Sequence, residues 1–443
     1  MSSFPESTPS FPYELRVWPI AESLDAEGEV DERAAGWADA VAIGFGSEAV
    51  GPDAIRRAAA ADAADGQQIC GVYPTTAPAG GLPANIPVGT YASYPGTVNV
   101  GGGRLLAANL ITAVTVRPSH RRRGILSAMI GADLAKAQAA GFALAALTAT
   151  EAVIYGRFGF GEASTINAVT VDTSPGFALR SAPTGTVDLV PNDSAGELQS
   201  RLFESLHRSG FGSVSRPAAY RARVSGAWMH GNPDPDKAVR VAAHFGLDGG
   251  IDGYVSYKQI RAEGKPATLQ IIDLLALDAN AYLGLWEFLA GVDRTVSVSW
   301  ARPPGEDPLR WALVDSMRYS VSGVEDDLWL RLLDVPAALA ARKYWADGVV
   351  EFEVRDRMEL VAGKYRLTVR DGQGEVSRLA PDTELAWSLD TADLAALYLS
   401  GTRAGLFLAA GRFGAPSSGL ETAVAQFDAV FAVPAAPLNR TEF

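Results

Sequence analysis

One short stretch constrains the fold of this chain more than any other: Ile111–Gly124, with the sequence ITAVTVRPSHRRRG. Its first six residues are apolar and mostly β-branched, which is typical of a buried strand. Pro118 ends the strand because proline has no N–H to donate to a neighbouring strand. Apolar residues then recur at helical spacing after Gly124, and Gly141 is a suitable end for that helix. The segment therefore predicts a buried strand, a basic loop and a helix that begins directly after the loop.

The loop between this strand and this helix has the features of an anion-binding site. Backbone N–H groups in the first turn of a helix are unpaired and carry a partial positive charge. The arginines at 121–123 add donors that bind phosphate oxygens in pairs. A run of arginines is also typical of a solvated surface turn, and composition alone favours that simpler interpretation. Two common nucleotide motifs, Gly-x-x-x-x-Gly-Lys-Ser/Thr and Gly-x-Gly-x-x-Gly, are missing between a strand and a helix here.

The order of residues in this segment resembles a known family. Arg121-x-x-Gly124 after a Val-x-Val strand is similar to the acetyl-CoA pyrophosphate loop of the GNAT superfamily of N-acetyltransferases. Leu126 stands where that superfamily usually has a small residue, as in one branch, the enhanced intracellular survival (Eis) family. The strings VTVRPSHRRRGIL and IYGRFGFG (154–161) are very similar to that family. The resemblance extends to the C-terminal tail and so covers essentially the whole chain.

This resemblance implies a mixed α/β and α+β architecture of three domains. We expect a catalytic GNAT domain at 1–173, a degenerate GNAT-like domain at 186–321 and a sterol-carrier-like domain at 325–443. The middle domain is also predicted by a repeat of the strand–helix–strand pattern over 269–301, whose connection DANAYLG has no arginine. We therefore expect it to bind no CoA. The family assembles as a hexamer, so the resemblance implies a homo-oligomer.

Periodicity and turn residues predict the individual elements. Residues 174–195 contain proline, serine and glycine and are expected to form a linker. A short helix at 151–158 is expected to follow a buried strand at Phe142–Thr150. Nearer the N-terminus, the pattern predicts strands at Tyr13–Pro19, 67–72, 89–93 and 105–116, and helices at Asp31–Phe45 and Pro52–Ala64.

The resemblance assigns coenzyme contacts to particular residues. The backbone of two strand residues would pair with the pantetheine amides, and the loop and first helical turn would hold the phosphates. Arg122 is expected to point to solvent, and Thr150 lies where the family contacts the acyl arm. The expected acetyl-CoA contacts are Val114, Val116, Arg121, Arg123, Gly124, Ile125 and Thr150.

The resemblance also assigns the catalytic groups. Tyr155 would be the general acid that protonates the departing thiolate, although an aromatic residue in an Ala-rich helix is by default part of the core. The family uses the carboxylate of its last residue as general base, which corresponds to Phe443. An α-carboxylate is a weak base, with a pKa of about 3.3–3.7, and a chain end usually frays. A buried or water-relayed setting would therefore be required.

Substrate binding follows less directly from the sequence. The family's acidic contact falls near Glu48, and Glu442 could add negative charge for a polyamine. The predicted activity is transfer of acetyl from acetyl-CoA to amines of aminoglycosides or other polycationic small molecules. One alternative is a protein lysine or N-terminal acyltransferase, because N-myristoyltransferases also pair two such domains with a C-terminal carboxylate. The other is a non-enzymatic lipid carrier that uses the third domain.

Composition narrows the remaining possibilities. The 443 residues carry a formal net charge of −13, which disfavours binding to nucleic acid or an anionic membrane and attracts polycations. Cys70 is the only cysteine, so no disulfide can form within the chain, and a cytoplasmic setting in a bacterium is expected, with secretion also compatible. One cysteine and four histidines offer few ligands for a soft metal, so no metal is expected.

Overall fold

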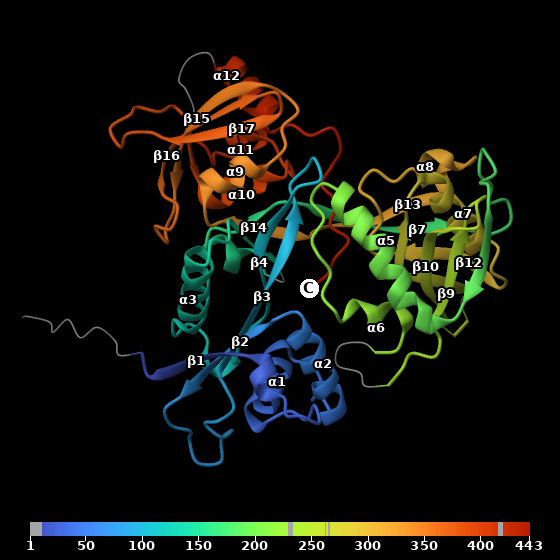
Figure 1. The fold of residues 1–443 in the computed structure, drawn as a ribbon, viewed down its shortest axis with the longest axis horizontal. Helices are drawn as coiled ribbons and strands as arrows, with labels where there is room; N and C mark the ends of the chain where they lie inside the picture. The colour runs from blue at the N-terminus through green and yellow to red at the C-terminus, as the bar shows by residue number, and fades with distance from the viewer. Residues whose placement is uncertain (1–10, 150, 229–233, 262, 265, 415–419) are drawn as a thin grey trace, which may run out of the picture. The chain divides into compact units, whose positions relative to one another are not determined.

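A computed structural model describes residues 11–149, 151–228, 234–261, 263–264, 266–414 and 420–443 (Figure 1). Two compact units divide the chain. The first unit contains residues 1–95, 110–139 and 230–233, and the second contains 96–109, 140–229 and 234–443. Among the described helices, none combines the length and apolar composition needed to span a bilayer.

The first unit contains an antiparallel sheet covered by two helices. Strand β2 (Gln68–Pro74) pairs on one side with β1 (Tyr13–Pro19) and on the other with β3 (Gly89–Asn99). Helices α1 (Glu32–Phe45) and α2 (Pro52–Ala64) contribute Trp37 and Ala59 to a core that also holds Trp18, Ile69 and Tyr73. The buried Trp37 indole donates a 2.8 Å hydrogen bond to the Cys70 carbonyl, so α1 is held against β2 by a satisfied polar contact as well as by packing.

Local signals explain where these helices begin and end. The Asp31 carboxylate accepts a hydrogen bond from the Ala34 N–H and caps α1, which ends at Gly46 in the left-handed conformation. Pro52 occupies the first position of α2, where its missing N–H costs no hydrogen bond. The predicted strands and helices of this part of the chain are confirmed, and β3 is longer than predicted.

The basic segment of the first unit folds as its sequence predicts. Strand β4 (Leu105–Val116) ends before a single 3-10 turn at Pro118–His120, and helix α3 (Ile125–Ala139) begins immediately after Gly124. Ile125, Met129, Ile130 and Leu134 form the buried face of α3, which matches the predicted helical spacing.

The second unit contains a seven-stranded sheet in the order β13-β7-β12-β11-β10-β9-β8. Strands β11 and β12 are parallel and are joined by α7, which confirms the strand–helix–strand repeat predicted in this region. Trp286, Trp300 and Tyr282 lie in its core. The elements are β7 (Thr165–Asp172), β8 (Thr186–Val190), α5 (Ala195–Ser209), α6 (Tyr220–Ser225), β9 (Arg240–Phe245), β10 (Ile251–Ile260), β11 (Ala267–Ala276), α7 (Ala279–Ala290), β12 (Thr295–Trp300), α8 (Leu309–Ala312) and β13 (Tyr319–Asp326).

The predicted linker at 174–195 is wrong in its second half. Residues Thr186–Val190 form β8, which pairs antiparallel with β9 at the edge of the sheet. Three of these five residues are exposed, so the strand shows little of the apolar pattern from which a strand is predicted. Its pairing with β9 depends on a segment about fifty residues away, which local composition does not reveal.

The C-terminal part of the second unit has a four-stranded sheet, in the order β17-β16-β15-β18, with helices packed on it. Its core is rich in aromatic rings, including Phe352, Trp387 and Phe427. The elements are α9 (Val335–Ala341), β15 (Gly348–Arg355), β16 (Gly363–Arg370), β17 (Gln373–Arg378), β18 (Ser388–Asp390), α10 (Thr391–Tyr398), α11 (Ala404–Ala409) and α12 (Leu420–Phe431).

Two strands cross the domain limits that the sequence suggests. Strand β14 (Leu328–Leu332) pairs antiparallel with β5 (Leu144–Thr148) and with β6 (Gly161–Glu162), although it precedes the C-terminal sheet in the chain. Strand β7 lies between β12 and β13 of the large sheet, although it follows β6. The limits 1–173, 186–321 and 325–443 therefore stay a prediction, and the strands are interleaved across them.

Candidate active site

The arginine loop of the first unit has a backbone suited to an anion. Arg122 and Gly124 have φ angles of 62° and 77°, on either side of Arg123. Left-handed residues within such a turn direct successive N–H groups toward one concave face. A side chain at position 124 would meet no atom within 4 Å, so the backbone conformation is the feature that favours glycine there. The Gly124 carbonyl accepts the first helical hydrogen bond, from Ala128, at 3.0 Å.

The arginine side chains of this loop are exposed and, among the residues that the structure describes, bind only neutral partners. Arg123 donates to the Tyr13 hydroxyl at 3.2 Å and to the Ser119 carbonyl at 3.1 Å. Among the described residues, neither Arg121 nor Arg123 forms an ion pair, so both charges remain available to an anion. Burial lowers the pKa of His120, and the charges of Arg123 and Arg117 lower it further, as expected in a positive local potential.

The preceding strand is irregular near Val114 and Val116. Ala113 has a φ of 51° in the middle of β4, a conformation that costs a residue with a Cβ about 1–3 kcal/mol. The Thr90 hydroxyl donates to the Ala113 carbonyl at 2.9 Å and so helps to hold this conformation. Val114 and Val116, which follow it, are half-buried. Alanine carries no sequence signal for a left-handed strand residue, so this feature was not predicted.

Helix α4 (Ala152–Gly156) of the second unit carries Tyr155, which is buried and stacks edge-on against Phe160 at 6.2 Å between ring centroids. Burial, and then the charge of Glu151, raises the pKa of Tyr155 to about 12. Its phenol is therefore neutral at physiological pH and retains a proton to donate. The helix is shorter than the predicted 151–158.

A buried arginine fixes the turn after this helix. Arg331 donates from Nη1 to the Phe158 carbonyl at 2.7 Å and from Nη2 to both oxygens of Asp356, at 3.0 and 2.8 Å. Gly159, with a φ of 78°, lies so close that a Cβ would be 1.6 Å from Nη1. Glycine is therefore required there for both its conformation and its size.

The C-terminal tail is ordered within the second unit. Thr441 is fully buried, and its hydroxyl donates to the Val214 carbonyl at 2.6 Å. The Glu442 N–H donates to the Tyr220 hydroxyl at 2.7 Å. The Thr148 hydroxyl, at the end of β5, donates to the main-chain oxygen of Phe443 at 3.0 Å. These contacts place the Phe443 carboxyl group beside the end of β5, four positions before α4 begins.

The two acidic residues predicted to bind substrate have different surroundings. Glu48 is exposed after α1 in the first unit. Glu442 forms an ion pair with Arg223 at 2.6 Å in the second unit. Burial opposes its charge, but Arg223 and Arg302 hold the pKa of Glu442 below its ordinary value. The negative charge of Glu442 is therefore already balanced in part by Arg223. Thr150, which was predicted to contact the acyl arm, lies outside the described residues.

Comparison with known proteins gives the same domain plan. Acetyltransferase (GNAT) domain models match residues 86–163 and 212–355, and a sterol carrier protein domain model matches residues 335–439. An uncharacterized N-acetyltransferase from Streptomyces avermitilis is 34% identical over 335 residues, which cover 73% of this chain and 79% of that protein. The N-acetyltransferase Eis from Mycobacterium tuberculosis is 33% identical over 345 residues, which cover 76% and 80%. The chain belongs to the Eis family of GNAT N-acetyltransferases.

A solved structure supports the same assignment. The crystal structure of an Eis protein from Mycobacterium abscessus matches with a TM-score of 0.71 at 30% identity, covering 85% of this chain and 90% of that one. The predicted fold of two GNAT domains and a sterol-carrier-like domain is confirmed. As an Eis-family member, the chain is an N-acetyltransferase, as predicted.

GNAT acetyltransferases use acetyl-CoA, and the arginine loop fits its pyrophosphate. The fit rests on three observations: two positive φ angles, exposed arginines with no carboxylate partner in the described part of the chain, and a fifteen-residue helix that begins at the loop. The connection before α7 differs because the Asp278 carboxylate caps that helix by accepting from Ala281 at 2.8 Å. Within the described residues, no group of three or more His, Cys, Asp and Glu side chains could hold a metal ion.

Several residues that shape this Eis-type site were not predicted. Thr148, Tyr220 and Arg223 hold the tail, and Arg331 holds the turn after α4. Each contacts a segment between about 170 and 295 positions away, so no local pattern reveals it. The arginine loop was found because all of its parts are adjacent in the chain.

Proposed function

We propose that this Eis-family enzyme transfers acetyl from acetyl-CoA to amines of aminoglycosides or other polycationic small molecules. The observation that carries the proposal is the hydrogen bond from Thr148 to Phe443, because it brings a carboxyl group to the strand that leads into the Tyr155 helix. Acetyl transfer to an amine needs a general acid and a general base close to the reacting groups. The contacts of the C-terminal tail hold the Phe443 carboxyl group beside β5, and Tyr155 lies on the helix that follows β5.

Tyr155 is the proposed general acid. Acetyl-CoA, when bound, supplies the activated acetyl thioester, and its thiolate needs a proton as it leaves. The buried Tyr155 phenol is neutral at physiological pH because burial raises its pKa to about 12. Its helix is fixed through the turn that Arg331 and Gly159 hold, which limits movement of the hydroxyl.

The Phe443 carboxylate is the proposed general base, which takes a proton from the attacking amine. An exposed α-carboxylate, with a pKa of about 3.3–3.7, is too weak a base for efficient proton transfer. Phe443 is half-buried and ordered, so its carboxyl group is not in the setting of a frayed chain end. The Thr148 hydroxyl fixes the carboxyl group in direction.

The coenzyme residues are proposed in the roles described for the loop. Arg121 and Arg123 would bind phosphate oxygens, and the N–H groups of Gly124 and Ile125 would add neutral donors. Val114 and Val116 would present backbone groups to the pantetheine amides, and Thr150 would contact the acyl arm. Glu48 and Glu442 are the proposed acidic contacts of the acceptor, with the Glu442 charge shared with Arg223. We also propose that the chain acts in the cytoplasm and assembles as a homohexamer. Light scattering of the purified protein would measure the molar mass of the assembly and so test the hexamer.

A thiol-release assay over a panel of amines tests the proposal. The purified chain is incubated with acetyl-CoA and an aminoglycoside, spermine, a lysine-containing peptide or no amine. The products are identified by mass spectrometry. We expect thiol release and an acetylated product with the aminoglycoside or spermine, and much less with the peptide. Turnover of the peptide alone would instead support a protein acyltransferase. Acetyl-CoA binding without turnover of any amine would contradict the proposal.

A further inference from the structure

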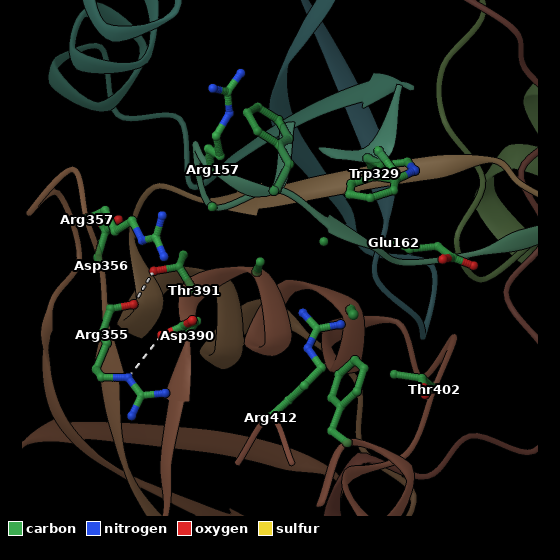
Figure 2. Close-up of a pocket in the computed structure, with 18 of the residues that line it drawn as sticks. Arg157, Glu162, Trp329, Arg355, Asp356, Arg357, Asp390, Thr391, Thr402 and Arg412 are labelled. Atoms are coloured by element: carbon green, nitrogen blue, oxygen red, sulfur yellow. Dashed lines mark hydrogen bonds and ion pairs between the residues drawn. The ribbon is translucent and has the colours of Figure 1, made fainter. Parts of the chain in front are cut away.

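A pocket of about 580 Å³ lies within the second unit, and none of the residues assigned above to coenzyme and catalysis is among those that line it (Figure 2). One wall comes from α4 and the segment that leads into β6, and the other from the ends of β15 and β18 and from α10. Its volume falls in the range of about 300–1,000 Å³ that small-molecule sites in proteins have.

Close backbone packing joins the elements on the two sides of this pocket. A Cβ at Gly161 would lie 1.8 Å from the Ala392 carbonyl oxygen, so β6 and α10 touch through their backbones. A Cβ at Gly401 would lie 2.4 Å from the Ala163 carbonyl oxygen. The two walls are thus joined by contacts that leave no room for a side chain, and the pocket is bounded by rigid elements.

The lining is basic in a chain whose net charge is −13. Four arginines line the pocket against three carboxylates: Arg157, Arg355, Arg357 and Arg412, with Glu162, Asp356 and Asp390. The Asp356 carboxylate is fully used, because it accepts from Arg331 and from two backbone N–H groups. It therefore adds little negative potential to the pocket.

Two of the four arginines are free to bind a ligand. Arg355 pairs with Asp390 at 2.9 Å, and Arg412 pairs with Asp393. Arg157 and Arg357 are exposed and form no ion pair within the part of the chain that the structure describes. Figure 2 shows Arg357 on the opposite side of the pocket from Glu162.

The same pocket also offers apolar surface. Val153 on α4 is 83% exposed, although it is a large aliphatic residue on a pocket wall. Phe160 and Trp329 are buried in the lining, and Phe407 is half-buried. A ligand that covers Val153 would remove that apolar surface from water, which favours binding.

We propose that this pocket binds a small organic anion, with a carboxylate or phosphate group held by Arg357, the positive charge of Arg157 at the edge of the pocket attracting it, and an apolar body against Val153. Guanidinium groups suit both anions because they donate two parallel hydrogen bonds to paired oxygens. The proposal does not depend on the acetyl-transfer assignment, since it concerns binding alone.

Fluorescence titration with anilinonaphthalene sulfonate, an aromatic anion, tests the site in the full chain with CoA at saturation. The double variant Arg157→Ala/Arg357→Ala should bind this probe at least about tenfold more weakly, because the charge-assisted contact of Arg357 and the attraction of the Arg157 charge are both lost. The matched control is Arg370→Ala, which removes an exposed arginine outside the lining and should leave affinity unchanged. Unchanged affinity in the double variant would overturn the proposal.

Competition separates the two anion classes and guards against a variant that misfolds. Dodecanoate and naphthyl phosphate are added to the wild-type chain with bound probe, beside the neutral dodecanol and naphthol. Displacement by either anion, with much weaker displacement by its neutral counterpart, supports the proposal and identifies the preferred anionic group. Equal displacement by the neutral compounds would overturn it. Val153→Asp, which places a negative charge on the apolar wall, should also weaken the probe, and unchanged binding in that variant would count against the site.

Discussion

The Thr148 hydroxyl donates a 3.0 Å hydrogen bond to the main-chain oxygen of Phe443, a residue 295 positions later in the chain. Thr148 is the last residue of β5, and Tyr155 lies on the helix that follows. This contact joins the tail to the strand that precedes the proposed acid.

Removing the Thr148 hydroxyl should lower turnover. Thr148→Val keeps the shape of the side chain but cannot donate to Phe443, so kcat should fall by roughly 10–150-fold if a charge-assisted hydrogen bond worth about 1.5–3 kcal/mol positions the base. Thr148→Ser keeps the hydroxyl and is the matched control, with kcat near the wild-type value. Steady-state kinetics check both, and equal kcat in the two variants would show that this hydrogen bond does not position the base.

Tyr155→Phe should reduce kcat by roughly 10²–10⁴ while the melting temperature stays close to that of the wild type. The ring packing against Phe160 is retained, and only the proton is lost. The pH profile supplies a second check. Because burial raises the pKa of Tyr155 to about 12, wild-type kcat should show no loss of this proton between neutral pH and pH 10. Near-normal turnover in the variant would make Tyr155 a packing residue.

Removing the two loop arginines should weaken acetyl-CoA binding. In Arg121→Ala/Arg123→Ala, each lost contact to phosphate should cost about 1.5–3 kcal/mol, or roughly 10–150-fold in Kd. Calorimetric titration measures this directly. Arg122→Ala is the control, because the Arg122 side chain is expected to point to solvent. Alanine also has a Cβ, so it pays a similar conformational cost at the φ of 62° found at this position. Unchanged affinity in the double variant would move the phosphate site elsewhere.

Acetyl-CoA should bind once per chain. The connection before α7 presents the Asp278 carboxylate to its helix N-terminus, where a phosphate would otherwise be attracted, and no arginine lies in that connection. The same calorimetric titration yields the stoichiometry. Two sites per chain would mean that the second GNAT domain also binds the coenzyme.

His207 should make the fold sensitive to acid. Its ring lies between the Thr97 and Ser213 hydroxyls, at 2.8 and 2.9 Å, and burial, then Arg208, lowers the pKa of His207 to about 4. In the unfolded chain the His207 ring binds a proton below pH 6.5, whereas in the folded chain it does so only near pH 4. The contribution of the neutral, buried ring to the free energy of unfolding is therefore fully present above pH 6.5 and is lost as the pH falls through 4. In urea unfolding, His207→Gln should show a smaller loss of stability between pH 7 and 4.5 than the wild type. An identical loss in both would assign the acid sensitivity to other groups.

The parts of this structure that the sequence predicts are those encoded within short segments. The strand, loop and helix around Arg121–Gly124 follow from proline, glycine and helical spacing, and α3 begins where these residues indicate. Tyr155 was singled out only through resemblance, since a buried aromatic residue on a short helix is indistinguishable from core.

Long-range pairing could not be predicted in the same way. Strand β14 pairs with β5 and β6, and β8 pairs with β9. In each case the two paired strands lie far apart in the chain, so no local pattern indicates the pairing. The ion pair between Arg223 and Glu442 and the contact between Arg331 and Phe158 have the same origin. A single sequence shows which residues can pair, but it does not show which partners they meet.

The most direct test of the central claim measures acetyl transfer when the Phe443 carboxylate is removed without changing any side chain. A few residues added after Phe443 convert its carboxylate to a neutral amide, and the same residues added before Met1 serve as the control. Single-turnover acetylation of an aminoglycoside or spermine is then compared with acetyl-CoA binding by calorimetry. The account predicts a loss of roughly 10²-fold or more in the C-terminally extended chain, normal acetylation in the N-terminally extended chain, and unchanged acetyl-CoA affinity in both. Full activity in the C-terminally extended chain would contradict the assignment of Phe443 as the general base.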